Sequence, residues 1–147
     1  MANGQTAAVA ARAIDPSAAE ALCAGLIQFL ETGDPPAGLF RPDAFCDLTV
    51  PQWRLQFEGA DAIVDGRRRL HPPPGRVPRW RCDPTPSGFV VEVEERWHDR
   101  DGDWYCRELM RADVVDGAIA ALSVYCTGDW DEARVARHAR EVSLSRP

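Results

Sequence analysis

Two tight-turn signals divide the C-terminal half of the chain into three alternating runs. Asp-Gly occurs at Asp101–Gly102 and again at Asp116–Gly117, each time between runs in which apolar and polar residues alternate. Asp-Gly in this setting is a strong signal for a β-hairpin. We therefore predict three antiparallel strands, over residues 92–97, 104–110 and 118–127. Because a tight turn fixes the pairing register, it also predicts which side chains share a face.

The predicted register gathers polar groups on an otherwise apolar face. Opposing Trp97 and Trp104 across the first turn places Glu95 and Glu108 on the same face, and a two-residue second turn places Tyr125 opposite Glu108. The full set on this face is Phe89, Val91, Val93, Glu95, Trp97, Trp104, Cys106, Glu108, Met110, Ala112, Ala121, Ser123, Tyr125 and Thr127. The opposite face collects Glu92, Glu94, Arg96, His98, Tyr105, Arg107, Leu109, Arg111, Leu122 and Val124.

The two glutamates on the apolar face are candidate proton carriers. A carboxylate buried without partners costs several kcal/mol or becomes protonated. A carboxyl group in an aromatic pocket has a raised pKa, which suits a general acid or base. The alternative for Glu95 and Glu108 is a structural one, in which each lies near a strand end and reaches water or binds backbone amides.

The second face has a simpler interpretation. Glu94 lies opposite Arg107 in the predicted register, which indicates exposed cross-strand ion pairs worth about 0.2–1 kcal/mol each. Leu109, Leu122 and Val124 are apolar among these charges. We expect them to form the contact of a homodimer.

The order of predicted elements is that of an α+β fold. Asp15 and Pro16 begin a helix that ends near Gly33, because Asp caps a helix and Pro suits its first position. Further elements are a short helix over 39–45, a strand over 53–58, a helix over 60–70, irregular chain over 71–78, a short strand over 79–82 and a last helix over 129–141. We expect residues 1–14 to be a disordered lead-in and residues 15–147 to form one domain.

Composition excludes several classes of function. A net charge of −6 without a basic patch argues against a nucleic-acid partner. No apolar run is long enough to predict a membrane span, and no glycine-rich phosphate loop predicts an organic cofactor. The five cysteines are scattered and include no Cys-x-x-Cys pair, so we predict no disulfides. The three histidines lack the spacing of metal ligands, so we predict no metal site. We expect free thiols in a reducing cytoplasm.

Four segments carry a resemblance to a known superfamily. They are the amphipathic helix over 16–32, Phe-Cys-Asp-Leu-Thr-Val-Pro at 45–51, Gly-Ala-Asp-Ala-Ile at 59–63 and Asp-Gly-Ala-Ile at 116–119. Together they resemble the nuclear transport factor 2-like superfamily, and within it the SnoaL-like polyketide cyclase and ketosteroid isomerase group. The resemblance implies a cone-shaped, curved antiparallel sheet covered by N-terminal helices, here with an added C-terminal helix.

The resemblance also implies one catalytic residue. Asp47 occupies the position of an acid–base aspartate that moves protons beside a carbonyl; its alternative interpretation is a turn or helix-terminus aspartate. The isomerases' tyrosine on the first helix has no counterpart, since residues 16–32 contain no tyrosine. This departure argues against the steroid-isomerase reaction itself.

Two kinds of function follow from this reasoning. The first is a small enzyme of secondary metabolism that performs cofactor-free cyclisation, isomerisation or hydration and dehydration on an apolar, oxygenated ligand. Asp47, Glu95 and Glu108 would carry protons, and Tyr125 would donate a hydrogen bond to an oxyanion. The predicted substrate-binding residues are Trp53, Trp97, Trp104, Met110, Ser123, Thr127, Trp130 and His138. The alternative is a non-catalytic ligand-binding or dimerisation module, or a subunit that assists a partner enzyme.

Overall fold

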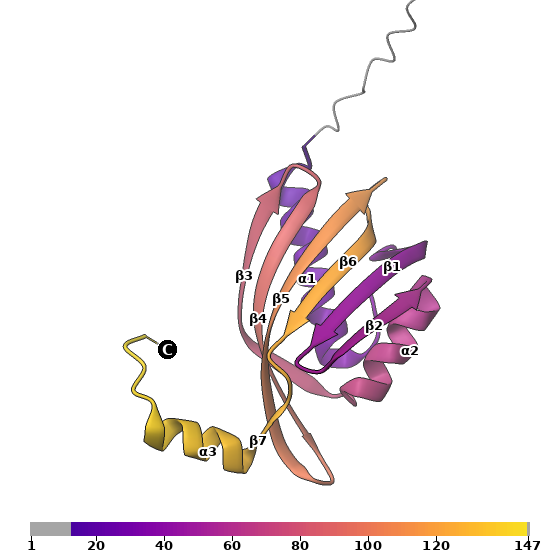
Figure 1. Ribbon diagram of the computed structural model, residues 1–147. Helices are drawn as coiled ribbons and strands as arrows, with labels where there is room; N and C mark the ends of the chain where they lie inside the picture. Colours follow the sequence, from indigo (N-terminus) through magenta and orange to yellow (C-terminus); the bar gives the residue numbers. More distant parts are fainter. Residues whose placement is uncertain (1–12, 147) are drawn as a thin grey trace, which may run out of the picture.

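A computed structural model describes residues 13–146, so the predicted lead-in over 1–14 lies almost wholly outside the described residues. Three helices and seven strands follow one another along the chain (Figure 1). The helices are α1 (Pro16–Thr32), α2 (Ala60–Leu70) and α3 (Glu132–Glu141). The strands are β1 (Phe40–Val50), β2 (Trp53–Glu58), β3 (Gly75–Thr85), β4 (Gly88–Asp99), β5 (Gly102–Val115), β6 (Ala118–Cys126) and β7 (Trp130–Asp131).

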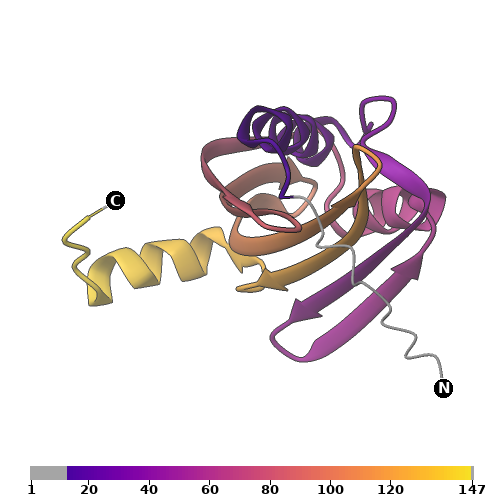
Figure 2. The same cartoon turned by 90° about the horizontal axis from the view of Figure 1, so that it is seen from above.

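The strands form one curved sheet with α1 and α2 against its inner face (Figure 2). The strand order is β2-β1-β6-β5-β4-β3, and β7 pairs with β5 beyond the end of β6. The predicted α+β class and curved, helix-covered sheet are confirmed. One pairing differs from the antiparallel expectation, because β1 runs parallel to β6.

Helix α1 covers the inner face because its sequence gives it clear ends and one apolar side. The Asp15 carboxylate accepts a hydrogen bond from Ser17 N at 2.8 Å, which satisfies a free N–H of the first turn. Gly33 ends the helix with φ 73°, a left-handed conformation that glycine adopts without strain. Leu26 and Phe29 of α1 are buried in the same core as Phe89 and Met110 of the sheet.

The first hairpin has the register that its turn predicts. Trp97 of β4 lies opposite Trp104 of β5, and Val93 lies opposite Glu108. Glu108 therefore points to the inner face, where it is 5 % exposed. Ion pairs also form on the opposite face, but Arg107 pairs with Glu92, and the predicted partner Glu94 lies near Arg79 and Arg96 instead.

The second hairpin departs from its predicted register through a β-bulge. The turn itself is as predicted, with Val115 opposite Ala118. The pairing then shifts between Asp113 and Val114, which leaves Ala120 as an extra residue on β6. One extra residue turns every later side chain to the other face.

Because of the bulge, four of the predicted inner-face residues lie on the outer face instead. They are Ala121, Ser123, Tyr125 and Thr127, and Tyr125 is 62 % exposed. Leu122 and Val124, which were expected outside, are buried in the core instead. The prediction failed because the turn sequence carries no signal for the bulge that follows it.

Strands β1 and β3 include residues that were not predicted to be strand. The helix expected over 39–45 is wrong, because Phe40 begins strand β1, which is held between β6 and β2. Strand β3 begins at Gly75 and absorbs Pro78 and Pro84, although a short strand after irregular chain was expected. Proline is tolerated there because β3 forms an edge of the sheet.

The C-terminal helix extends away from the sheet, as Figures 1 and 2 show. Asp131 caps it by accepting a hydrogen bond from Arg134 N at 2.8 Å, so Asp129 is not its cap. Trp130, just before it, packs on Tyr105 of the outer face with ring centroids 5.6 Å apart. No helix in residues 13–146 is long and apolar enough to cross a membrane.

The bulge can be tested by truncating one side chain on each face of β6 to alanine. Leu122→Ala should lower the free energy of unfolding by about 2–5 kcal/mol, because it leaves a cavity in the core. Tyr125→Ala should change it by only about 0.5 kcal/mol, since the ring is on the surface. Urea unfolding of both variants measures the difference. The reverse order of stabilities would show that β6 keeps the unbulged register.

Candidate active site

A cavity of about 440 Å³ opens between the sheet and the two N-terminal helices. Its size lies within the range of about 300–1,000 Å³ that is usual for small-molecule sites. Its walls are mostly apolar side chains of α1, α2 and strands β1, β2, β5 and β6, among them Leu26, Phe29, Leu48, Phe57, Met110 and Val124. Its polar lining includes Arg67, His71, Glu108, Cys126, Asp129 and Arg134.

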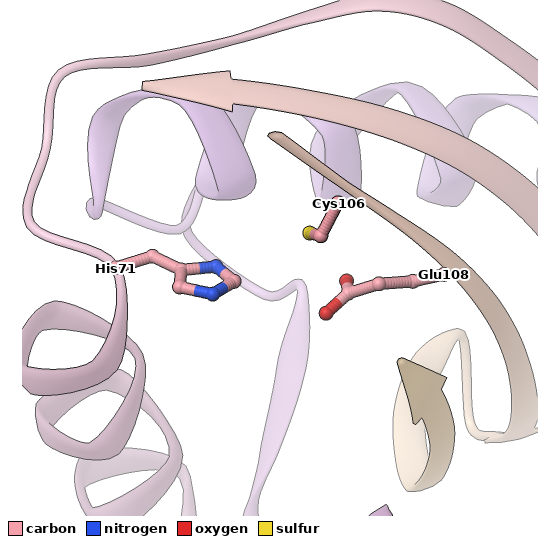
Figure 3. Close-up of side chains that lie close together, drawn as sticks. All are labelled: His71, Cys106 and Glu108. Carbon is pink, nitrogen blue, oxygen red and sulfur yellow. The ribbon is translucent and has the colours of Figure 1, made fainter. Parts of the chain in front are cut away.

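Glu108 is a carboxyl group in an apolar wall. Burial, the nearby charge of Glu95 and the Cys126 thiol together raise the pKa of Glu108 well above its ordinary value. Among residues 13–146 no basic side chain forms an ion pair with it. Burial therefore favours the neutral, protonated form of Glu108, whose carboxyl group lies close to His71 and Cys106 (Figure 3).

Glu95 points to the same face of the sheet as Glu108, but its pKa is shifted in the opposite direction. Burial raises the pKa of Glu95, but the charge of the Arg67 guanidinium and the hydrogen bond with His71 together outweigh burial and lower it. Arg67 Nη2 lies 2.8 Å from Glu95 Oε2 and also donates to the carbonyl of Leu30 at 2.7 Å. Glu95 is thus a buried, ionised partner of an arginine and is absent from the cavity lining.

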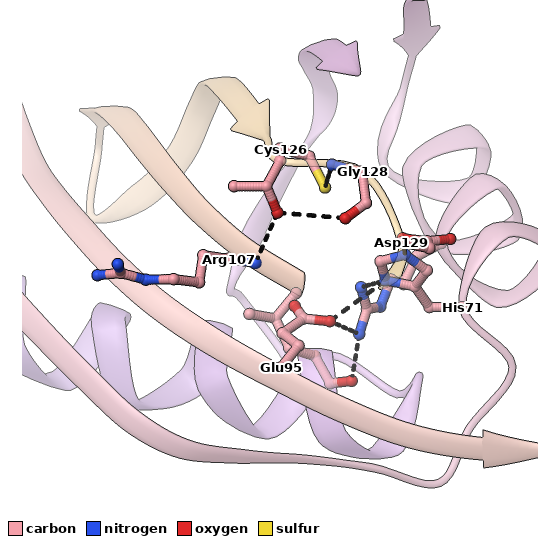
Figure 4. Close-up of polar contacts among 9 residues, drawn as sticks. His71, Glu95, Arg107, Cys126, Gly128 and Asp129 are labelled. Atoms are coloured by element: carbon pink, nitrogen blue, oxygen red, sulfur yellow. Dashed lines mark hydrogen bonds and ion pairs between the residues drawn. The ribbon is translucent and has the colours of Figure 1, made fainter. Parts of the chain in front are cut away.

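His71 connects this ion pair to the cavity (Figure 4). Its Nδ1 lies 3.2 Å from Glu95 Oε2, and its Nε2 lies 3.1 Å from Asp129 Oδ1. Trp97 stacks on the imidazole with ring centroids 4.2 Å apart, which fixes the plane of the ring. Burial opposes protonation, but the hydrogen bonds to Asp129 and Glu95 outweigh it and raise the pKa of His71.

Several potential metal ligands lie close together here. Ligand atoms of His71, Cys106 and Glu108 are within 4.8 Å of one another (Figure 3), as are those of Cys106, Cys126 and Asp129. However, both imidazole nitrogens of His71 already have hydrogen-bonding partners, and Arg67 Nη1 is 2.5 Å from Nδ1. The geometry therefore favours a hydrogen-bonded network, and the absence of a metal stays a prediction.

The predicted catalytic residues separate into two groups. Glu108 lines the cavity, and Glu95 lies outside the lining, where it contacts the lining residue His71. Asp47 and Tyr125 lie on the outer face, outside the cavity lining. Asp47 points outward because a turn after β1 changes the alternation, and there the hydrogen bond and charge of Arg54 lower the pKa of Asp47.

The tryptophans and Met110 take different positions around the cavity. Trp53 and Met110 line it, Trp53 at the exposed rim and Met110 in the buried wall. Trp97 lies behind His71, and Trp104 stacks on Trp97 with ring centroids 6.4 Å apart. Neither Trp97 nor Trp104 is among the lining residues, so neither fills the cavity.

The remaining predicted binding residues lie outside the cavity. Ser123 and Thr127 follow Tyr125 to the outer face, where Thr127 Oγ1 accepts a hydrogen bond from Arg107 N at 3.0 Å. Trp130 and His138 pack on each other away from the lining, with ring centroids 5.3 Å apart. The placement of these four side chains therefore differs from the sequence-based expectation.

Besides Cys126, which the bulge turns into the cavity wall, sequence reasoning missed three residues that the fold brings to the site. The sequence indicates only weakly that Arg67 points inward, through its helical spacing from Ile63 on the buried side of α2. His71 follows α2 in a proline-rich segment without periodicity, and Asp129 was interpreted as a helix cap. His71 and Asp129 are 58 residues apart, so only the tertiary fold shows that they meet.

Comparison with known proteins identifies the architecture. No family model and no curated protein matches the sequence. A nuclear transport factor 2-like protein from Anabaena variabilis matches with a TM-score of 0.64 at 13% identity, covering 77% of this chain and 89% of that chain. The chain has the nuclear transport factor 2-like fold.

Two further structures extend this nuclear transport factor 2-like likeness. A candidate ketosteroid isomerase from Kribbella flavida matches with a TM-score of 0.62 at 14% identity, covering 89% of this chain and 92% of that chain. A phenazine biosynthesis-related protein from Pseudomonas aeruginosa matches with a TM-score of 0.55 at 13% identity and the same coverages. At these identities the likeness concerns the fold alone, so function has to be argued from the site.

The protonation of Glu108 should be visible in the stability of the protein. Because its pKa is raised above 4.5, the folded state holds the proton more tightly than the unfolded chain. The free energy of unfolding of the native protein should therefore fall as pH rises from 4.5 through the raised pKa, by about 1.4 kcal/mol for each pKa unit of the shift. Glu108→Gln cannot ionise and should not show this loss.

Urea unfolding of both proteins between about pH 4 and about pH 8 measures the effect. Glu92→Gln, on the exposed outer face, serves as the matched control and should follow the native protein. Parallel curves for the native protein and Glu108→Gln would show that Glu108 ionises normally.

Proposed function

We propose that this protein is an enzyme that performs cofactor-free acid–base chemistry on a small, apolar, oxygenated molecule. The observation that carries the proposal is a carboxyl group, Glu108, whose pKa is raised by its burial in the wall of an apolar cavity. A neutral acid in such a place can donate a proton to a carbonyl or enolate oxygen as charge develops there. The SnoaL-like and ketosteroid isomerase-like reactions are chemistry of this kind.

A second proton carrier supports the proposal. Asp129 lines the cavity and is held by His71 through Oδ1, so its other oxygen, Oδ2, can accept a proton from a ligand. His71 is in turn held by Glu95 and by stacking on Trp97. The site thus offers an acid, Glu108, and a carboxylate–imidazole pair that can receive a proton.

An acid and a base on the walls of one cavity suit proton transfer at two atoms of one ligand. Asp129 would take a proton from a carbon beside a carbonyl, and Glu108 would deliver one to the carbonyl oxygen. The resulting enol can return to a ketone with a moved double bond, close a ring by attacking a second carbonyl, or expel water. Isomerisation, cyclisation and dehydration therefore share this first step, and the apolar walls set the substrate class.

Replacing the two proton carriers tests the proposal. Glu108→Gln keeps the shape and hydrogen bonding of the side chain but cannot transfer a proton, so turnover should fall about 10²–10⁴-fold. Asp129→Asn should have an effect of the same order. Glu92→Gln and Asp47→Asn, both outside the cavity, should change turnover little. Turnover can be measured as hydrogen–deuterium exchange into candidate ketones by mass spectrometry.

The outcomes separate the alternatives. If Asp47→Asn abolishes turnover while Glu108→Gln retains it, the proton carrier is on the outer face and the cavity assignment is wrong. If the ketones bind in the cavity but no variant and no native protein exchanges their protons, the protein is a ligand-binding module of the same fold.

We also propose a homodimer through the outer face of the sheet, in a reducing cytoplasm. Leu109 and Tyr125 lie directly opposite each other there, exposed to 48 % and 62 %. Charges of both signs surround them, including the Arg107–Glu92 pair, so the surface is complementary to a second copy of itself. Five free cysteines are consistent with the cytoplasmic location.

Sedimentation equilibrium at micromolar concentration tests the dimer. We expect the mass of two chains for the native protein and of one chain for Leu109→Arg, because the new charge would be buried in the contact. Leu144→Arg, on the exposed tail after α3, is the control and should leave the dimer intact. A native protein with the mass of one chain would contradict the proposal.

A further inference from the structure

The bulge in β6 places a thiol directly opposite the acid of the cavity. Cys126 is the cross-strand partner of Glu108, and both side chains line the cavity. Without the bulge, Tyr125 would take this position. The facing pair of a thiol and a carboxyl group is therefore a product of the tertiary structure.

The surroundings of Cys126 stabilise a thiolate. The backbone N–H of Gly128 donates a hydrogen bond to its Sγ at 3.3 Å (Figure 4). The Cys106 sulfur lies within 4.8 Å of it. A hydrogen bond with Cys106 is the main cause that lowers the pKa of Cys126 to about 7, against the effect of burial. A thiolate is the nucleophilic form of cysteine.

The other cysteines of the chain lack this combination. Cys46 also lines the cavity, but burial raises the pKa of its thiol to about 12. Cys23 and Cys106 are fully buried, and Cys82 lies on β3 outside the cavity. Cys126 is therefore the thiol that meets a ligand in its reactive form.

The buried position of Glu108 in the cavity wall is a second observation that points to a ligand. Glu108 is 5 % exposed, it lines the cavity, and no basic side chain in the described part of the chain pairs with it. A nucleophile with an acid beside it, in an apolar cavity, suits a molecule that needs both attack at carbon and a proton. We propose that Cys126 adds covalently to α,β-unsaturated carbonyl compounds bound in this cavity.

The addition balances without an oxidant or a further reactant. The Cys126 sulfur attacks the β-carbon and forms a carbon–sulfur bond, while the electrons of the double bond move through the α-carbon to the carbonyl oxygen. Glu108 gives its proton to the enolate, which becomes the saturated ketone. The proton that left the thiol on ionisation returns to Glu108 through water, so the sum is addition of S–H across the double bond.

This inference rests on the cavity of the proposed function but not on turnover. The probe is 4-phenyl-3-buten-2-one, an apolar unsaturated ketone, and its saturated analogue 4-phenyl-2-butanone reports reversible binding by calorimetry. Intact-protein mass spectrometry at pH 7 should show one adduct of the unsaturated ketone, and peptide mapping should place it on Cys126. An excess of the saturated analogue should slow the reaction.

Three variants make the assignment specific. Cys126→Ser should abolish the adduct at position 126. The remaining thiols should then react at least about tenfold more slowly, which is the ratio expected between a thiol that is largely ionised and an ordinary thiol near neutral pH. Glu108→Gln should also slow it, because no acid is left to protonate the enolate, while binding of the saturated analogue persists. Cys82→Ser, outside the cavity, should react like the native protein.

An adduct on Cys46 or Cys82, or adducts spread over several cysteines, would overturn the inference. If the saturated analogue binds and no adduct forms, this inference fails while the proposed acid–base function stands. If neither ketone binds, the cavity does not accept such ligands, and both proposals fail.

Discussion

The guanidinium of Arg67 is the contact on which the arrangement of the site depends. From the last turn of α2 it donates hydrogen bonds to the carbonyl of Leu30 at the end of α1 and to Glu95 of strand β4, and it lies beside His71 of the following loop. Three parts of the fold are thereby joined by one buried cation. Removing one partner of such a buried pair costs about 3–5 kcal/mol, so these elements are held in one relative position.

The same arginine makes two similar glutamates chemically different. Glu95 and Glu108 are both buried on the inner face, yet Arg67 forms its ion pair with Glu95 and not with Glu108. Glu95 is therefore ionised and orients His71, while its negative charge adds to burial in keeping Glu108 protonated. An acid and a carboxylate–imidazole pair in one cavity follow from this division.

Much of the sheet could be predicted from short-range signals, and the site could be predicted only in part. The Asp-Gly turns gave the correct register for β4 and β5, which placed Glu95 and Glu108 inside. The strand after the second turn was predicted with the right partner but the wrong face, because Ala120 bulges. That one residue exchanged Tyr125 for Cys126 in the cavity wall and moved two apolar side chains from the outer face to the core.

The sequence by itself determined the fold class, the curved sheet with its helices on one side, and two carboxyl groups facing an apolar interior. These depend on alternation, turn residues and helix caps, which are local properties of the chain. Only the tertiary structure decided that Arg67 binds Glu95, that His71 meets Asp129, and that Asp47 points outward. These depend on a bulge, a hairpin turn and contacts between distant loops, where the energy of packing outweighs any local preference.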